Sequence, residues 1–217
     1  MSMSDITFTN ARLVDPKAGT VTRGAVTVSQ GIITQVFDDK YNQFHGETSQ
    51  IIDCGLKYLA PGIVDIGVKV CEPGERHKES YRSAGKAAAA GGVTTMVTRP
   101  DTTPAIDSPE SLEFVTRRAN DAAPVNVLPM AALTKGREGR EMTEIGFLMD
   151  AGAVAFTDCD RVVENTKVFS RALTYASALG ALVIAHPQDP GLSAGAAATS
   201  GKFASLRGLP SVSPMAE

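Results

Sequence analysis

The stretch "VDIGVKVCEPGE", residues 64–75, decides how this chain folds. A run rich in β-branched residues ends abruptly in a Cys-Glu-Pro-Gly turn. β-Branched residues favour strands, whereas proline and glycine favour turns. The pattern is typical of a strand in an α/β barrel, which ends in a loop at the active-site face.

Strand-like and helix-like segments alternate from residue 59 onward. The strand-like segments are residues 62–70, 93–100, 125–133, 153–158 and 181–187, and the helix-like segments between them are residues 78–92, 107–122, 142–152 and 165–180. The second helix has a clear start, because Ser108 is a good N-cap and Pro109 suits the first helical position. The alternation predicts parallel strands joined by right-handed crossovers, in a barrel or in an open doubly wound sheet.

The first part of the chain has a different pattern of apolar and turn-forming residues. Short runs such as "ITFTNARLVDP" and "AVTVSQGIITQVF" predict strands, with a hairpin at Gly31. We therefore expect a small β-rich module over residues 1–58 and a larger α/β domain over residues 59–217. The module contains no cluster of catalytic residue types.

Composition excludes several classes of protein. The chain has 21 basic and 24 acidic residues, a net charge of −3 and no long run of either sign, which argues against a nucleic-acid surface. Its apolar stretches are far shorter than the ~20 residues of a membrane helix, and the N-terminus shows no secretory signal. Its three cysteines are widely spaced and fit neither a disulfide framework nor a CxxC zinc site. We expect a reduced, cytoplasmic protein that binds neither nucleic acid nor membrane.

Polar residues gather where each predicted strand ends. Carboxyl ends of parallel strands meet at one face, which is where barrel enzymes place their chemistry. In strand order these residues are Asp65, Lys69, Cys71 and Glu72; Arg99, Asp101 and Thr102; Thr134 and Lys135; Asp158, Cys159 and Asp160; and His186, Gln188 and Asp189.

Seven segments spread along the chain together suggest a family. They are "LAPGIVD", "EPGE", "AAAAGGVTTMV", "RPDTTPAIDSPE", "LTKGREGREMTEIGFLMDAGAVAFTD", "AHPQD" and "GLPSVSPMAE". In this order and spacing they resemble the dihydroorotase branch of the amidohydrolase superfamily. The resemblance implies a small β-sandwich-like module beside a (β/α)8 TIM barrel, of which only about the first five strands are present here. Five strands would leave the sheet edges and the apolar interior open, so we expect a missing C-terminal half of the barrel.

The resemblance also implies a site that this chain has altered. The family closes carbamoyl aspartate to dihydroorotate with a metal-bound hydroxide, and its metal site begins with a His-x-His pair at the end of strand one. That pair corresponds here to Gly67 and Lys69, a residue without a ligand atom and an ammonium without a lone pair. An arginine that grips the substrate corresponds to Cys71. An asparagine contact corresponds to Asp101, which would repel an anionic substrate.

Some metal-ligand positions remain. His186 matches the strand-five histidine, and Asp158 falls in the acidic pair after strand four, whose second member here is Cys159; which of these two aligns with the ligand stays open. One imidazole and one carboxylate hold a catalytic metal poorly, because such sites generally use three protein ligands. We therefore expect no cofactor in this chain. We also hypothesise that Lys69 fills the volume left by the metal and pairs with Asp158 or Asp65.

Less specific interpretations compete with functional ones at several residues. Cys71 and Cys159 are favoured as small filling residues over a nucleophilic thiol that His186 could activate. "GREGRE", residues 136–141, is favoured as a solvated turn over an anion-binding loop. His45 and His77 lie among polar residues and are expected at the surface.

The resemblance leads to one functional expectation and two rivals. We expect an inactive dihydroorotase-like protein of pyrimidine biosynthesis, which on family analogy could assemble with aspartate carbamoyltransferase or with itself. The alternative is an active cyclic amidohydrolase whose zinc is held by His186 and by ligands from the missing half. A thiol enzyme using Cys71 or Cys159 is the third hypothesis.

Overall fold

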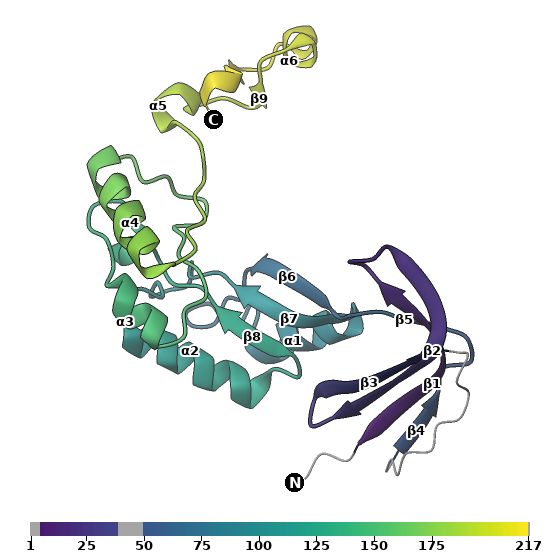
Figure 1. Cartoon of the computed structure of the whole chain (residues 1–217). Helices are drawn as coiled ribbons and strands as arrows, with labels where there is room; N and C mark the ends of the chain where they lie inside the picture. The colour runs from purple at the N-terminus through teal and green to yellow at the C-terminus, as the bar shows by residue number, and fades with distance from the viewer. Residues whose placement is uncertain (1–4, 39–49, 217) are drawn as a thin grey trace. The chain divides into compact units, whose positions relative to one another are not determined.

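The computed structural model describes residues 5–38 and 50–216 and divides the chain into two compact units, residues 1–62 and 63–217 (Figure 1). The division lies close to the predicted boundary at residue 58. His45 falls outside the described residues, and His77 is exposed, as expected.

The first unit contains one mixed sheet in the described residues. Its strands are in the order β3-β2-β1-β4, and β5 also pairs with β1; their bounds are β1 Ile6–Asp15, β2 Thr20–Ser29, β3 Ile32–Asp38, β4 Gln50–Asp53 and β5 Tyr58–Leu59. The predicted hairpin at Gly31 is confirmed, because Gln30 and Gly31 both have positive φ, as a two-residue turn between β2 and β3 requires. The described part of this unit is a single layer, so the second layer of a sandwich is not among these residues.

The second unit is built on a parallel sheet. Strands β6 (Ile63–Val68), β7 (Val93–Thr98) and β8 (Asn126–Pro129) pair in chain order. Two single parallel bridges, Ala131–Phe156 and Phe156–Val183, continue the same succession. The predicted parallel sheet is therefore confirmed over five successive segments, although the last two are bridges and not full strands. The sheet does not close on itself within the described residues.

Helices connect the parallel segments. Their bounds are α1 Tyr81–Ala90, α2 Pro109–Ala122, α3 Ile145–Asp150 and α4 Thr166–Leu179, with a short 3-10 helix at Lys135–Arg137. The predicted start of α2 is confirmed: Ser108 is the N-cap, its side chain accepts from the Ser111 amide, and Pro109 is the first helical residue. Helix α4 ends at Gly180 in the left-handed conformation that favours glycine (φ 68°).

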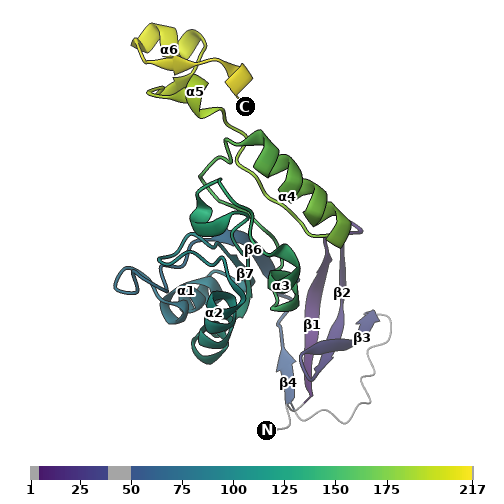
Figure 2. The same cartoon turned by 90° about the vertical axis from the view of Figure 1, so that its left-hand side faces the viewer.

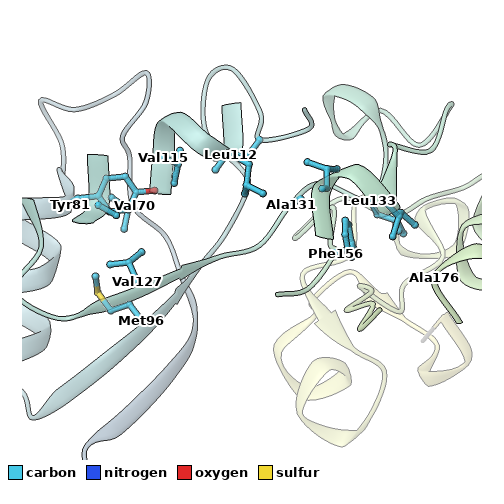
Figure 3. Close-up of a cluster of buried hydrophobic side chains, with 14 of the residues drawn as sticks. Val70, Tyr81, Met96, Leu112, Val115, Val127, Ala131, Leu133, Phe156 and Ala176 are labelled. Atoms are coloured by element: carbon cyan, nitrogen blue, oxygen red, sulfur yellow. The ribbon is translucent and has the colours of Figure 1, made fainter. Parts of the chain in front are cut away.

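The main core lies between the helices and one face of the parallel sheet. Helices α1 and α2 lie side by side against it in both views (Figures 1 and 2). Its largest fully buried side chains include Ile145 and Leu148, together with Tyr81, Met96, Leu112, Leu133 and Phe156, which Figure 3 labels. Successive strand residues face opposite sides of a sheet, so Val97 faces away from this core. Its register partners Ile66 and Leu128 are 66% and 41% exposed, which leaves an apolar face uncovered by the described residues.

The last described segment consists of short elements. These are α5 Pro190–Ser193, β9 Ala198–Thr199, α6 Lys202–Arg207, β10 Ser211–Val212 and a 3-10 helix at Pro214–Ala216. The predicted helix start at Ser213 and Pro214 corresponds to that single 3-10 turn. None of the described helices has both the length and the apolar composition that a membrane crossing requires.

Candidate functional site

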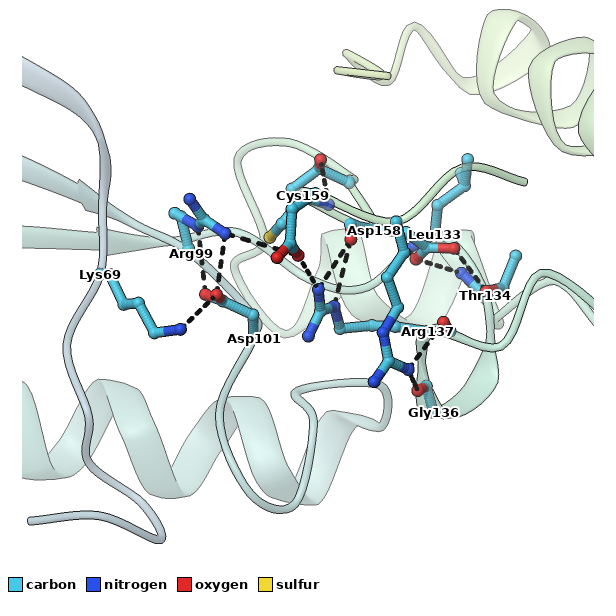
Figure 4. A network of polar contacts seen from close by, with 12 residues as sticks. Lys69, Arg99, Asp101, Leu133, Thr134, Gly136, Arg137, Asp158 and Cys159 are labelled. Atoms are coloured by element: carbon cyan, nitrogen blue, oxygen red, sulfur yellow. Dashed lines mark hydrogen bonds and ion pairs between the residues drawn. The ribbon is translucent and has the colours of Figure 1, made fainter. Parts of the chain in front are cut away.

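The candidate site lies at the carboxyl ends of the parallel segments, as the alternation predicts. Lys69 follows β6, and Arg99 and Asp101 follow β7. Arg137 lies in the loop after β8, and Asp160 follows the fourth segment. Figure 4 shows Lys69, Arg99, Asp101 and Arg137, which come from the loops after β6, β7 and β8 and are far apart in the sequence.

These five residues form a row of alternating charges, here called the charge chain. Lys69 Nζ lies 3.0 Å from Asp101 Oδ2, and Arg99 donates to both oxygens of the same carboxylate at 3.1 and 2.8 Å. Arg99 Nη2 is also 3.8 Å from Asp160 Oδ1, which accepts a 2.6 Å hydrogen bond from Arg137. Three cations and two carboxylates thus alternate along the loop ends, which leaves one positive charge in excess.

The hypothesis for Lys69 is wrong about its partner. Lys69 pairs with Asp101 and not with Asp158 or Asp65, and Asp65 is exposed. Asp101 was expected to repel anions, but its side chain is 3% exposed and lies between two cations. Lys69 and Asp101, two of the four residues that depart from the expected pattern, therefore compensate each other in charge.

Burial alone would raise the pKa of Asp101, but its hydrogen bonds and charge interactions with Lys69 and Arg99 outweigh burial and lower the pKa below 3.8. A carboxylate whose pKa is lower in the folded state than in the unfolded state stabilises the fold above its unfolded-state pKa. That contribution is lost as the pH falls through the folded-state pKa.

We therefore expect acid to destabilise wild type more than the Asp101→Asn variant. Urea unfolding between about pH 5 and pH 2 would measure both free energies of unfolding. Glu72 and Asp160 also have lowered pKa values, so the comparison with the variant isolates Asp101. Two parallel pH profiles would contradict the assignment.

Asp158 has a structural role that its metal-ligand position does not suggest. It is buried, its Oδ1 accepts from the Leu133 and Thr134 amides at 3.0 Å each, and its Oδ2 accepts from the Thr134 hydroxyl. Both carboxylate oxygens are thus used to hold the end of the β8 segment.

Gly136, Glu138, Arg140 and Glu141 are exposed, as the prediction of a solvated turn at residues 136–141 requires, but Gly139 is buried and so is Arg137. Its side chain is only 9% exposed and donates to the Asp158 carbonyl as well as to Asp160. Arg137 also has φ 58°, an uncommon backbone conformation for a residue other than glycine. Arg137 therefore fastens an otherwise exposed turn to the fourth segment, which a local pattern of glycines and charges could not reveal.

A cleft of about 360 Å³ opens beside the charge chain. Of the residues that the sequence singled out, it brings together Gly67, Arg99, Cys159, Asp160 and His186, but not Lys69, Cys71, Asp101 or Asp158. Its other lining residues are Ile66, Met130, Thr157, Ile184 and Ala185. His186 is exposed, and its Nε2 lies 3.0 Å from Gln188 Oε1.

The cysteines show no sign of activation. Burial, followed by the negative charge of Asp101, raises the pKa of Cys159, and the opposing effects of Arg99 and Arg137 are smaller. A raised pKa reduces the thiolate that a nucleophile needs. Cys159 is thus better suited to filling space than to catalysis, and Cys71 is partly buried at the start of the Glu-Pro-Gly turn.

Glu72 is a structural residue whose role sequence reasoning missed. It is buried, and its carboxylate accepts from Arg118 Nε at 2.7 Å and from the Tyr81 amide at 3.0 Å, with Arg76 at 3.4 Å. These contacts join the loop after β6 to the start of α1 and to the middle of α2. The "EPGE" motif makes Glu72 visible in the sequence, but Arg118, the residue that Glu72 contacts, lies 46 positions later.

The described residues do not fit a zinc centre. Gly67 offers no ligand atom, the Lys69 ammonium is paired, and the Asp158 carboxylate is occupied by three donors. Within residues 5–38 and 50–216, no three His, Cys, Asp or Glu side chains lie close enough together to hold a metal ion. Catalytic zinc sites generally need three protein ligands and an open position.

Comparisons with known proteins agree with this fold. A family model described as dihydro-orotase-like matches residues 56–216. The chain is 37% identical over 212 residues to the dihydroorotase of Sulfurihydrogenibium sp. (strain YO3AOP1), covering 98% of this chain and 49% of that protein. It is 38% identical over 199 residues to the dihydroorotase of Bacillus caldolyticus, covering 90% and 46%. The chain thus spans about half the length of these relatives.

Solved structures give the same picture at the level of fold. An L-hydantoinase (dihydropyrimidinase) from Arthrobacter aurescens superimposes with a TM-score of 0.73 at 22% identity, covering 88% of this chain and 42% of that one. A dihydropyrimidinase from Brevibacillus agri NCHU1002 gives 0.68 at 17% identity, covering 87% and 41%. From the match over most of its length, the chain belongs to the dihydroorotase-like family of the amidohydrolase superfamily.

Proposed function

We propose that this chain is part of a dihydroorotase-like protein that has lost its metal centre and its catalytic activity. The observation that carries the proposal is the ion pair between Lys69 and Asp101 at 3.0 Å. It places an ammonium and its counter-ion where the resemblance expects an imidazole and a neutral amide. Without an open ligand set, no hydroxide can be generated and no amide carbonyl polarised.

The proposal includes the larger architecture. The five parallel segments would be the first five strands of a (β/α)8 barrel, completed by strands outside these 217 residues. The exposed apolar face supports this, since Ile66 is 66% exposed and Leu182 60% exposed. Additional strands would bury these side chains, which contributes about 25 cal/mol per Å² of apolar surface.

Metal analysis and a dihydroorotase assay would test the proposal. We expect the full-length protein, purified without chelators, to contain less than stoichiometric zinc. We also expect that it does not catalyse the interconversion of carbamoyl aspartate and dihydroorotate. The Bacillus caldolyticus dihydroorotase, purified in the same way, would serve as the positive control. Near-stoichiometric metal with turnover would overturn the proposal.

One observation keeps an active amidohydrolase as the second candidate. His186 is exposed on the cleft, so its imidazole could bind a metal through Nδ1, or through Nε2 in place of the Gln188 contact, if other ligands come from outside this chain. This candidate predicts turnover of dihydroorotate, a hydantoin or a dihydropyrimidine that disappears on His186→Ala. Unchanged turnover in that variant would exclude it.

For the role of an inactive homologue, we propose assembly, either with aspartate carbamoyltransferase or with a second copy of the protein. A fold retained without its site is generally retained for its contacts, since function lies in the site. Light scattering after size exclusion, with each protein alone and with both together, would test the partnership. A mixed oligomer would support the partnership with the carbamoyltransferase, and a dimer or larger assembly of the protein alone would support self-assembly. A monomer that elutes independently of the carbamoyltransferase would count against both.

A further inference from the structure

We infer that the carboxyl edge of the sheet is closed to divalent cations by its backbone and its charge chain, so that histidines returned to positions 67 and 69 would not restore a metal site. The inference rests on the proposed loss of the metal centre and adds that the loss is not reversible at those two side chains. Two independent features of the structure support it.

The first feature is the backbone at Gly67. Ile66 pairs with Val97 and Val68 pairs with the next residue, Thr98, so Gly67 is an extra residue in the ladder, which is a β-bulge. Its φ is 95°, a conformation that L side chains rarely adopt. No atom outside its chain neighbours lies within 4 Å of where a Cβ would be, so the obstacle is the backbone and not a lack of space.

The bulge also separates positions 67 and 69. In a regular strand residues i and i+2 point the same way, which is why two alternate histidines can bind one ion. Here Gly67 lines the cleft, whereas Lys69 is not among the lining residues and turns to Asp101. Histidines at the two positions would therefore not point toward the same metal ion.

The second feature is the charge chain. Its two carboxylates are each within ion-pair distance of two cations: Asp101 of Lys69 and Arg99, and Asp160 of Arg99 and Arg137. The charge chain has three positive and two negative side chains, so it carries one positive charge in excess. A divalent cation would have to displace Lys69 or Arg99 from the buried Asp101 carboxylate and would meet the repulsion of the remaining cations, which is strong at short range beside Asp101 and weaker at Asp160, whose side chain is 72% exposed. Replacing Lys69 alone leaves both guanidiniums in place.

The test compares zinc binding by wild type and by the Gly67→His/Lys69→His variant. Equilibrium dialysis against zinc, followed by metal analysis, would give the zinc content, and thermal unfolding with and without zinc would give a second readout. We expect the variant to bind no more zinc than wild type and to show no zinc-dependent rise in melting temperature. One zinc per chain with a raised melting temperature would overturn the inference. Stoichiometric zinc in wild type would instead overturn the proposed function.

Matched variants keep the inference testable if the double variant does not fold. Gly67→Ala should lower the melting temperature by roughly 2–4 °C. Gly91→Ala should not, because Gly91 has φ −84° and a Cβ there would make only ordinary contacts. Equal melting temperatures for the two would refute the backbone feature. Lys69→His alone, which keeps the glycine, tests the charge chain, and stoichiometric zinc in that variant would refute it.

Discussion

Replacing Asp158 with alanine is expected to lower the free energy of unfolding by about 3–5 kcal/mol, among the largest losses for a single side chain. The substitution removes the acceptor of two buried backbone amides, Leu133 and Thr134, and of the Thr134 hydroxyl. Each buried donor left without a partner costs about 1–3 kcal/mol. The loss should occur with or without metal in the buffer, because the role of this carboxylate is structural.

Urea unfolding monitored by circular dichroism would measure the effect. Asp121→Ala is the matched control, since Asp121 lies exposed near the end of α2, and a surface change of this kind should stay within about 0.5 kcal/mol. Asp158→Asn should fall between the two, because it keeps one acceptor oxygen but directs an NH2 group toward a donor. A loss below about 1 kcal/mol for Asp158→Ala would contradict the hydrogen bonding described.

The second large effect is expected at Glu72. Glu72→Ala should lower the free energy of unfolding by about 2–4 kcal/mol, because it removes a buried carboxylate and leaves the Tyr81 amide and the Arg118 guanidinium without it. Arg118 keeps 28% of its side chain exposed, so water recovers part of its loss. This places Glu72 below Asp158 in expected effect.

A double-mutant cycle would apportion the Glu72 effect. The free energies of unfolding of Glu72→Ala, Arg118→Ala and the double variant should reveal a coupling of about 1–3 kcal/mol. Glu113→Ala, an exposed acidic residue on α2, serves as the control. If the two single losses add without coupling, the 2.7 Å contact contributes nothing to stability.

The fold was predictable wherever local signals determine it. The cap at Ser108 and the hairpin at Gly31 follow from hydrogen-bonding and backbone preferences that act within a few residues. The predictions of the fourth and fifth strands were less accurate, because in the structure one bridge joins the fourth segment to the third and one bridge joins it to the fifth. An apolar run shows that a segment is buried, but not how long its ladder is.

The membership of the candidate site was predictable in part, since Arg137 was not expected there, and the pairing of its residues was not predictable. Alternation and strand ends place Lys69, Asp101, Asp158 and His186 at one edge of the sheet. The sequence did not indicate that Lys69 contacts Asp101, 32 positions later, or that Arg137 is buried against the fourth segment. Such pairs depend on which loops bend toward one another.

The sequence alone determined the parallel α/β class, the family and the absence of the expected histidines at positions 67 and 69. These features depend on residue identity and on periodicities of a few residues. Only the tertiary structure decided that Asp101 neutralises Lys69, that Asp158 is occupied by backbone donors, and that Gly67 lies in a bulge. Ion pairing and hydrogen bonding act over a few ångströms in space, so they are determined only once distant loops have been brought together.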